Sequence, residues 1–521
     1  MLFAALELVR EWLPFLRTWF FVALAIVSLL TLGWLLYPRR GFGRHVPGPW
    51  LPKVSGLPLA WYDIWNRRND HILQWHRQYG PVVCIAPNEV SVATLESTKD
   101  VYSTALRWPK SNYFDHFKGY GKNGMRSAFA TKPYEEHRAK RRLISAFYQA
   151  TTIYKLPQIE QYVQECSRAV LRQIQHGQGV DVYSLTDWYA LDIITYLVFG
   201  PDFGSRAVES TCPERDILAL LKHQQFVGSF RIQYPNAYHY LSSIFAKLIP
   251  RLRYLQADSE FASWCKQRTL AAMEAPRISD SQSLLRHLLE IRGKDGEEEN
   301  QQLDREYIAA EILDNINAAE ATVSVTATYL IWRLTEAPEW QRKIRKELTA
   351  LPVQPDGSLS FADLDSRVPS LEACLREVYR LHPASSGRAE RIVPQGGHVL
   401  CGVYLPQGTI VSASVVALHR DERIFPDPDR FDPGRWLDAD PLTLKMREAQ
   451  LIPFGYGARI CLGKALATLE IKVLIANLYL RYETVMGSST TPESMKQCST
   501  HDAVPKALKC VVWFQEVAEE V

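Results

Sequence analysis

A single cysteine in a glycine-rich turn constrains this chain more than any other feature of its sequence. Residues 453–463 read PFGYGARICLG, and they hold one thiol, that of Cys461. Glycine adopts backbone conformations that other residues avoid, so Gly457 and Gly463 allow the backbone to approach a flat partner closely. Residues 462–480 then read LGKALATLEIKVLIANLYL, which predicts a long helix. The N-terminus of such a helix favours a thiolate.

The use of cysteine along the chain bears on the role of Cys461. The nine cysteines are scattered and never form a C-x-x-C pair, which argues against a disulfide framework and against a cysteine-cluster zinc site. This usage favours a reducing compartment. A lone thiolate suits the axial position on a metal whose other ligands come from a cofactor, and haem is the leading case. Arg459 is placed to meet an acidic substituent of the ring. A buried structural cysteine is the alternative.

The turn resembles the haem-binding signature of the cytochrome P450 family, F-x-x-G-x-R-x-C-x-G. Each fixed position is matched, by Phe454, Gly457, Arg459, Cys461 and Gly463. The resemblance implies a mainly α fold with small β-sheets, and haem b with Cys461 as its axial thiolate ligand. It extends along most of the body of the chain.

Two further segments are similar to structural motifs of this family. LREVYRLHP contains Glu377 and Arg380 and is similar to the family's E-x-x-R helix. FPDPDRFDPGRW is similar to its P-x-R-F segment, so the resemblance implies an ion triad of Glu377, Arg380 and Arg430. A surface ion pair of little energetic value is the alternative for the first two residues.

Haem-propionate contacts are also implied by the resemblance. Arg391, in RIVPQGGHVLCGVYLPQGT, is expected to approach a propionate. In YEEHRAKRRLISAFY, Arg141 matches the arginine of the family's W-x-x-x-R, and His137 stands where tryptophan is usual. Imidazole can still donate a hydrogen bond to a propionate. We expect Lys140 and Arg142 to be exposed charges, available to an acidic redox partner.

The match is weaker in the family's oxygen-activating helix, which usually reads A-G-x-(D/E)-T. Here EILDNINAAEATVSVTATYLIW aligns Ala318 and Thr322 with the alanine and threonine, and places Ala319 and Ala321 at the glycine and the acid. Thr322 follows Ala318 by one turn on the same face. Without the acid, either Glu320, a water chain or the substrate supplies protons, or the reaction has an altered outcome.

The N-terminus predicts a membrane anchor. Residues 18–37 contain no charge and are long enough to cross a bilayer as a helix. We predict a tail at 1–17, an anchor at 18–37, a proline-rich hinge at 38–52 and a catalytic domain at 53–521. A cleaved signal peptide is the alternative, but the apolar segment is too long for one. The slight excess of arginine after the anchor predicts that the catalytic domain lies in the cytoplasm. The resemblance to microsomal members of the family implies the endoplasmic reticulum membrane.

The body reads as one helix-rich domain with short strands. Strands are predicted at 82–94, 398–405 and 409–417. Helices are predicted at 134–149, 154–176, 214–230, 258–293, 305–350 and 369–381. The formal net charge of +3 is too small to indicate a nucleic-acid partner.

The resemblance implies a haem-thiolate monooxygenase that draws electrons from a separate NADPH–cytochrome P450 reductase. The overall pattern is similar to fungal microsomal enzymes of secondary metabolism, with an apolar small molecule as substrate. Residues 226–255 are rich in aromatic side chains and fall where the family has the lid of its access channel; ordinary helix packing explains them equally well. The alternative reaction is oxidative rearrangement, ring expansion or desaturation without oxygen insertion. A haem-binding sensor or membrane scaffold is the non-enzymatic alternative.

Overall fold

A computed structural model describes residues 19, 21–22, 25–29, 45–117, 126–175, 177–275, 282–294 and 304–517. The predicted tail, most of the predicted anchor and the first part of the hinge therefore lie outside the described residues. Within those residues, no helix combines the length and the apolar character that a membrane crossing requires.

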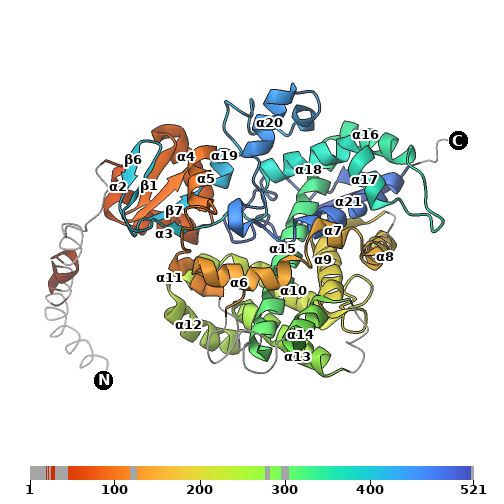
Figure 1. The fold of residues 1–521 in the computed structure, drawn as a ribbon, viewed down its shortest axis with the longest axis horizontal. Helices are drawn as coiled ribbons and strands as arrows, with labels where there is room; N and C mark the ends of the chain where they lie inside the picture. Colours follow the sequence, from red (N-terminus) through yellow and green to blue (C-terminus); the bar gives the residue numbers. More distant parts are fainter. Residues whose placement is uncertain are drawn as a thin grey trace, which may run out of the picture.

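A small β-rich region forms one side of the molecule (Figure 1). Its main sheet has the strand order β1-β2-β7-β4. The strands β1 and β2 form an antiparallel hairpin, β2 pairs in parallel with β7, and β4 pairs antiparallel with β7. A second hairpin joins β5 and β6. The bounds are β1 (Val82–Ala86), β2 (Glu89–Val92), β4 (Arg391–Ile392), β5 (His398–Leu400), β6 (Val403–Leu405) and β7 (Ile410–Ala413). Short helices cover this sheet: α2 (Trp50–Val54), α3 (Leu57–Ile64), α4 (Arg68–Tyr79), α5 (Leu95–Tyr102) and α19 (Val415–Leu418).

The last part of the predicted hinge belongs to this folded region. Val46 is fully buried, and the backbone N–H of Cys84 in β1 donates to the carbonyl of Pro47 at 2.8 Å. Helix α2 already begins at Trp50. A side chain at Gly48 would lie 2.8 Å from the Cys84 carbonyl oxygen, so this close approach requires glycine. The body therefore starts earlier than residue 53.

Helices form the larger part of the fold, and α15 (Arg305–Glu336) crosses its middle (Figure 1). Helix α15 packs along α9 (Val182–Phe199) and also contacts α18 (Pro369–Leu381) and α21 (Lys464–Arg481). Tyr189, Tyr329 and Tyr479 are fully buried between these helices. The remaining helices are α6 (Tyr134–Ser145), α7 (Ala150–Ile153), α8 (Pro157–Gln173), α10 (Pro213–Gln225), α11 (Gly228–Gln233), α12 (Pro235–Leu248), α13 (Ala257–Glu274), α14 (Leu284–Lys294), α16 (Pro338–Thr349), α17 (Phe361–Arg367) and α20 (Pro441–Gln450).

A three-stranded sheet completes the mainly α fold. It has the order β3-β9-β8, with β3 (Gly179–Asp181), β8 (Tyr482–Met486) and β9 (Val511–Glu516). The prediction of a mainly α chain with small sheets is therefore confirmed. One predicted helix, 305–350, is two helices, because Pro338 has no backbone N–H with which to continue α15. Likewise, the prediction at 258–293 corresponds to the separate helices α13 and α14.

Candidate active site

The turn before α21 is a short 3₁₀ helix, Gly457–Arg459. The backbone N–H of Cys461 donates to the carbonyl of Phe454 at 2.9 Å, and this bond closes the turn. Gly457 has a φ of 72°, and a Cβ there would lie 2.0 Å from the Tyr102 carbonyl oxygen. Both observations exclude a side chain at this position. Packing of the turn against α5 thus explains why the sequence needs glycine here.

The Cys461 sulfur lies at the N-terminus of α21. Its side chain keeps accessible surface although protein surrounds it on most sides, so it borders an internal space. Burial raises the pKa of the Cys461 thiol, whereas the backbone N–H groups of Gly463 and Lys464 and the charge of Arg141 lower it. Gly463 is the residue before the helix, so these amides carry the positive end of the helix dipole. The arrangement supports a thiolate once a metal cation neutralises it.

Five basic residues form a cluster, Lys110, His137, Arg141, Arg391 and Arg459, and Arg141 also acts on the Cys461 sulfur. Burial, together with the charges of the other four residues, lowers the pKa of His137 to about 2. Burial also lowers the pKa of Arg459 to about 9, with Arg391 and Arg141 adding to the effect. The pKa of Lys110 falls well below its usual value for the same reasons. The structure therefore brings together all four predicted propionate contacts, with His137 neutral.

The cation cluster is held by backbone carbonyls. The two terminal nitrogens of Arg459 donate to the carbonyls of Thr131 and Lys132 at 2.8 and 2.9 Å, whereas its buried Nε has no partner within the described structure. Arg391 donates to the carbonyl of Glu390 at 2.8 Å. Neutral carbonyls leave the cationic charge uncompensated, which is the property a site for two carboxylates needs. The donor set therefore fits the two propionates that a haem would present.

No sequence pattern singles out Lys110 as a member of this cluster. Its ammonium group lies 3.9 Å from the centroid of the Phe114 ring and 4.3 Å from that of Phe129. A β-bridge joins Lys110 to Arg391, almost three hundred positions later in the chain. Only the tertiary structure could have revealed it.

Lys140 and Arg142 differ from their predicted shared role as exposed charges. Arg142 is exposed, but Lys140 is 7% exposed. The Lys140 ammonium donates to the carbonyl of Arg126 at 2.8 Å and to the hydroxyl of Thr131 at 3.0 Å. Lys140 therefore ties the middle of α6 to the preceding loop, and it is not available to a redox partner.

The middle of α15 separates the predicted oxygen-activating residues onto two faces. Ala318 is exposed although it lies in a central helix, so it borders an internal space, and the Thr322 hydroxyl donates to its carbonyl at 2.8 Å. Glu320 is buried on another face, among Asp187, Lys222 and Asp502. Burial raises the pKa of Glu320 well above its usual value, with Asp187 adding to the shift. Ala318 and Thr322 thus share a face, as predicted, and Glu320 does not join them.

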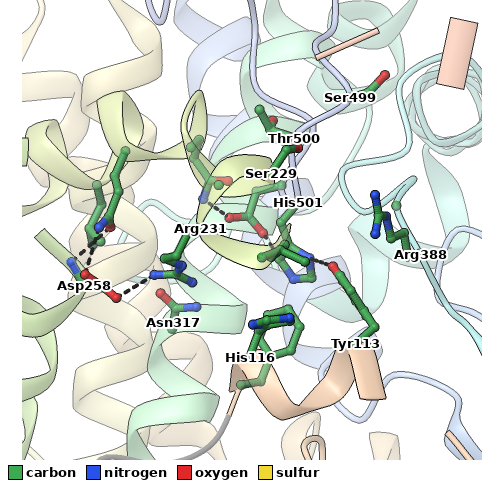
Figure 2. Close-up of a pocket in the computed structure, with 18 of the residues that line it drawn as sticks. Tyr113, His116, Ser229, Arg231, Asp258, Asn317, Arg388, Ser499, Thr500 and His501 are labelled. Carbon is green, nitrogen blue, oxygen red and sulfur yellow. Dashed lines mark hydrogen bonds and ion pairs between the residues drawn. The ribbon is translucent and has the colours of Figure 1, made fainter. Parts of the chain in front are cut away.

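A cavity lies beside the N-terminal half of α15, and Figure 2 shows part of its lining. The helix contributes Ala310, Leu313, Asp314 and Asn317 to the lining. Asn317, the last of these, directly precedes Ala318 in the chain. The lining is mixed: polar and charged residues are more numerous, whereas apolar atoms contribute the larger part of the exposed wall. Besides those of α15, the lining residues are Asp63, Arg68, Asn69, Tyr113, His116, Phe117, Leu221, Gln224, Gln225, Gly228, Ser229, Arg231, Ile232, Asp258, Phe261, Gly387, Arg388, Ser499, Thr500, His501 and Asp502.

Glu377 is the centre of a fully buried ion cluster. Its carboxylate accepts two bonds from Arg380, at 2.7 and 2.9 Å, and one from the Nε of Arg435, at 3.1 Å. The indole N–H of Trp436 donates to it at 3.0 Å. Arg435, and not Arg430, is therefore the third charged member. Arg430 is exposed and contributes its backbone carbonyl, which accepts from Arg380 at 3.0 Å. The two arginines lie in one motif, and the 3₁₀ turn Pro433–Trp436 directs the second one inward.

The cytochrome P450 family model matches residues 47–506, nearly the whole body described above. The chain belongs to the cytochrome P450 family. This cytochrome P450 is 38% identical over 501 residues to the cytochrome P450 monooxygenase FGM1 of Gibberella zeae, an alignment that covers 95% of this chain and 97% of the relative. It is 29% identical to pkfB of Emericella nidulans, over 84% and 86% of the two chains. It is 28% identical to tazI of Aspergillus terreus, over 94% and 97%. Both are also cytochrome P450 monooxygenases.

Membership of the family defines the class of chemistry. This cytochrome P450 is an oxidoreductase of the monooxygenase type. The family implies a haem-thiolate iron cofactor, a redox partner and a small-molecule substrate. Cys461 and the cation cluster, both within the matched residues, are the groups of this chain that fit such a cofactor.

Proposed function

We propose that this cytochrome P450 inserts oxygen from dioxygen into a small molecule of fungal secondary metabolism, by hydroxylation or by several successive oxidations. NADPH–cytochrome P450 reductase supplies the electrons. The observation that carries the proposal is the environment of the Cys461 sulfur. This sulfur accepts hydrogen bonds from backbone N–H groups at the start of α21, and a cluster of uncompensated cations lies nearby. The relatives named above are fungal cytochrome P450 monooxygenases, which supports the proposal of a monooxygenase in fungal metabolism.

Each group of the site has a defined task in this proposal. When bound, haem supplies dioxygen activation, which thiolate ligation promotes. Cys461 would ligate the iron, and the N–H groups of Gly463 and Lys464 would tune its electron donation. Arg391 and Arg459 would hold the propionates, together with Lys110, Arg141 and neutral His137. Thr322, whose hydroxyl donates to the Ala318 carbonyl, would orient a water on this face of α15.

Oxidative rearrangement, ring expansion or desaturation is the second candidate. The observation in its favour is the set of groups around Thr322, because Ala319 and Ala321 carry no proton donor and Glu320 lies on another face. Because general acid catalysis needs a positioned proton donor, the lack of one on this face is the reason to expect an altered reaction outcome.

A labelled-dioxygen experiment distinguishes the two candidates. The gene is deleted in its host, and the metabolite that accumulates is given to microsomes containing this protein, reductase and NADPH under ¹⁸O₂. We expect a hydroxylated product that carries one added ¹⁸O, because hydroxylation inserts one oxygen atom from dioxygen. We also expect Thr322→Ala to lower product formed per NADPH by about 10- to 100-fold, because the hydroxyl orients the proton-delivering water. Thr322→Ser is the matched control and keeps most of the yield. A new product without label contradicts oxygen insertion and supports rearrangement or desaturation.

We also propose that one face of the body rests on the endoplasmic reticulum membrane, beside an N-terminal anchor at 18–37. Large apolar side chains are exposed on α2, α3 and α12, and α11 contacts both α3 and α12. Exposed tryptophans are typical of side chains at the membrane interface. The most exposed of these residues are Trp50, Leu57, Trp61, Trp65, Tyr240, Ile244 and Leu248.

Removal of the anchor tests this attachment. We expect a chain that starts at residue 45 to float with phosphatidylcholine vesicles, because the apolar face still inserts. The double variant Trp61→Glu and Leu248→Glu should lower the vesicle-bound fraction at least several-fold, as charge is costly at that depth. Trp513→Glu, on β9, is the matched control and should bind like the parent. Equal losses in both variants would contradict a specific membrane face.

A further inference from the structure

The cationic side chains that line the cavity are already paired with carboxylates of the protein. Arg231 donates to Asp258 at 2.5 Å, an interaction shown in Figure 2. Arg388 is paired with Asp63, which also lies 3.4 Å from Arg68. These paired groups have little capacity left for an anionic ligand. The lining therefore does not select a carboxylate or phosphate by means of these arginines.

Asp314 differs from the other lining carboxylates. It projects from α15 at the cavity wall, and among the described residues no lysine or arginine lies within ion-pair distance of it. The hydroxyl of Ser127 hydrogen bonds to it, Glu311 repels its charge, and Lys110 attracts it from a greater distance. The Glu311 carboxylate is itself satisfied by the N–H of Ala128 at 2.8 Å and by the Tyr307 hydroxyl at 3.0 Å.

Asp502, another carboxylate of the lining, has more interaction partners at close range than Asp314. Asp502 is 5% exposed, accepts a hydrogen bond from Gln225, and lies 3.9 Å from the Nε2 of His501. His501 in turn contacts the Tyr113 hydroxyl at 3.2 Å, as Figure 2 shows. Asp314 is thus the lining carboxylate with the greatest need for a cation.

We propose that the substrate of this cytochrome P450 is an amphiphile with a basic nitrogen, and that Asp314 binds this nitrogen in its protonated form. The inference rests on the proposed function, because it assigns the substrate class of the same site. Apolar side chains in the lining, among them Leu221, Phe261 and Leu313, accommodate the carbon skeleton. The specificity-determining residue is Asp314, and burial, which raises its pKa to about 7, makes it responsive to a bound cation.

The helix also defines where oxidation occurs. Asp314, Ala318 and Thr322 follow one another at i, i+4 and i+8 on one face of α15. Eight residues of helix span about 12 Å at a rise of about 1.5 Å per residue. A nitrogen bound at Asp314 therefore lies about two helical turns from Thr322. The oxidised carbon is on the order of 10 Å from the nitrogen, so the carbons attached to that nitrogen are not the ones attacked.

Calorimetric titration of the full-length, haem-loaded enzyme tests the inference with three probes of equal chain length: octyltrimethylammonium, octanoate and 1-octanol. A quaternary ammonium cannot ligate iron, so it reports only the protein site. We expect wild-type enzyme to bind the cation at least about tenfold more tightly than octanoate. Close pairing of the ammonium group with the Asp314 carboxylate changes affinity by a factor of this order. Asp314→Asn should remove that preference and leave octanol affinity unchanged. Asp314→Glu should retain it.

Asp502→Asn is the matched control, because it removes a carboxylate from the same cavity. We expect its cation preference to resemble that of the wild type. The inference is overturned if the wild type shows no cation preference, if Asp314→Asn weakens all three probes equally, or if only Asp502→Asn loses the preference. The carbon monoxide spectrum of each preparation keeps the two proposals apart. A thiolate-type spectrum without cation preference contradicts the substrate class alone, whereas loss of that spectrum in wild type contradicts the proposed function.

Discussion

Replacing Cys461 with alanine is expected to abolish the thiolate-type carbon monoxide spectrum of the reduced enzyme and all oxygenation of substrate. Cys461 is the thiol that borders the internal space at the start of α21, where the N–H groups of Gly463 and Lys464 hydrogen bond to its sulfur. A methyl group can neither ligate iron nor donate electron density to it. We expect activity to fall by more than about a thousandfold, to the level of an enzyme without its essential metal ligand.

The matched control is Cys401→Ala. Cys401 is also exposed, but it lies in the β-rich region, where its sulfur contacts the Ser97 hydroxyl at 3.0 Å. We expect this variant to keep the spectrum and the activity of the parent. Far-ultraviolet circular dichroism of both variants separates loss of the ligand from loss of the fold. Survival of the thiolate spectrum in Cys461→Ala would show that another residue ligates the iron.

Local patterns predicted the part of the site that one segment builds. The turn around Cys461 is formed by residues within ten positions of one another. The backbone at Gly457 approaches the Tyr102 carbonyl too closely for any side chain, and a glycine in the sequence indicates such a contact. The helix that follows and the shared face of Ala318 and Thr322 also depend on short-range periodicity. These features were therefore readable from the sequence.

Features built from distant segments could not be read in this way. Lys110 reaches the cation cluster only because a β-bridge pairs it with Arg391. The mixed lining of the cavity also depends on which side chains of distant segments, such as Tyr113 and His501, face inward. The aromatic segment 226–255 was expected to form either the lid of the access channel or ordinary helix packing. Residues near its N-terminal end, within 228–232, border the cavity, whereas Tyr240 and Phe245 are exposed on α12. In each case the tertiary structure, and not the local sequence pattern, determines which side chains face the site.

The choice between Arg430 and Arg435 shows the same limit and has a large expected consequence. Both residues follow a proline-containing segment, and sequence pattern alone favoured the first. In the structure Arg435 is buried against the fully buried Glu377, whereas the Arg430 side chain is exposed. Of these two arginines, therefore, Arg435 is the one that joins Arg380 in compensating the charge of the buried Glu377 carboxylate.

We expect Arg435→Ala to lower the free energy of unfolding by about 3–5 kcal/mol, because it leaves the buried Glu377 with one charged partner fewer. Arg380 still binds both carboxylate oxygens, at 2.7 and 2.9 Å, so the variant should fold when it is prepared at low temperature. Urea unfolding followed by circular dichroism measures the change. Arg430→Ala is the matched control, since alanine keeps the backbone carbonyl that accepts from Arg380. It should change stability by no more than about 0.5 kcal/mol. Equal destabilisation by the two substitutions would restore Arg430 to the ion cluster, and the reverse order would exclude Arg435 from it.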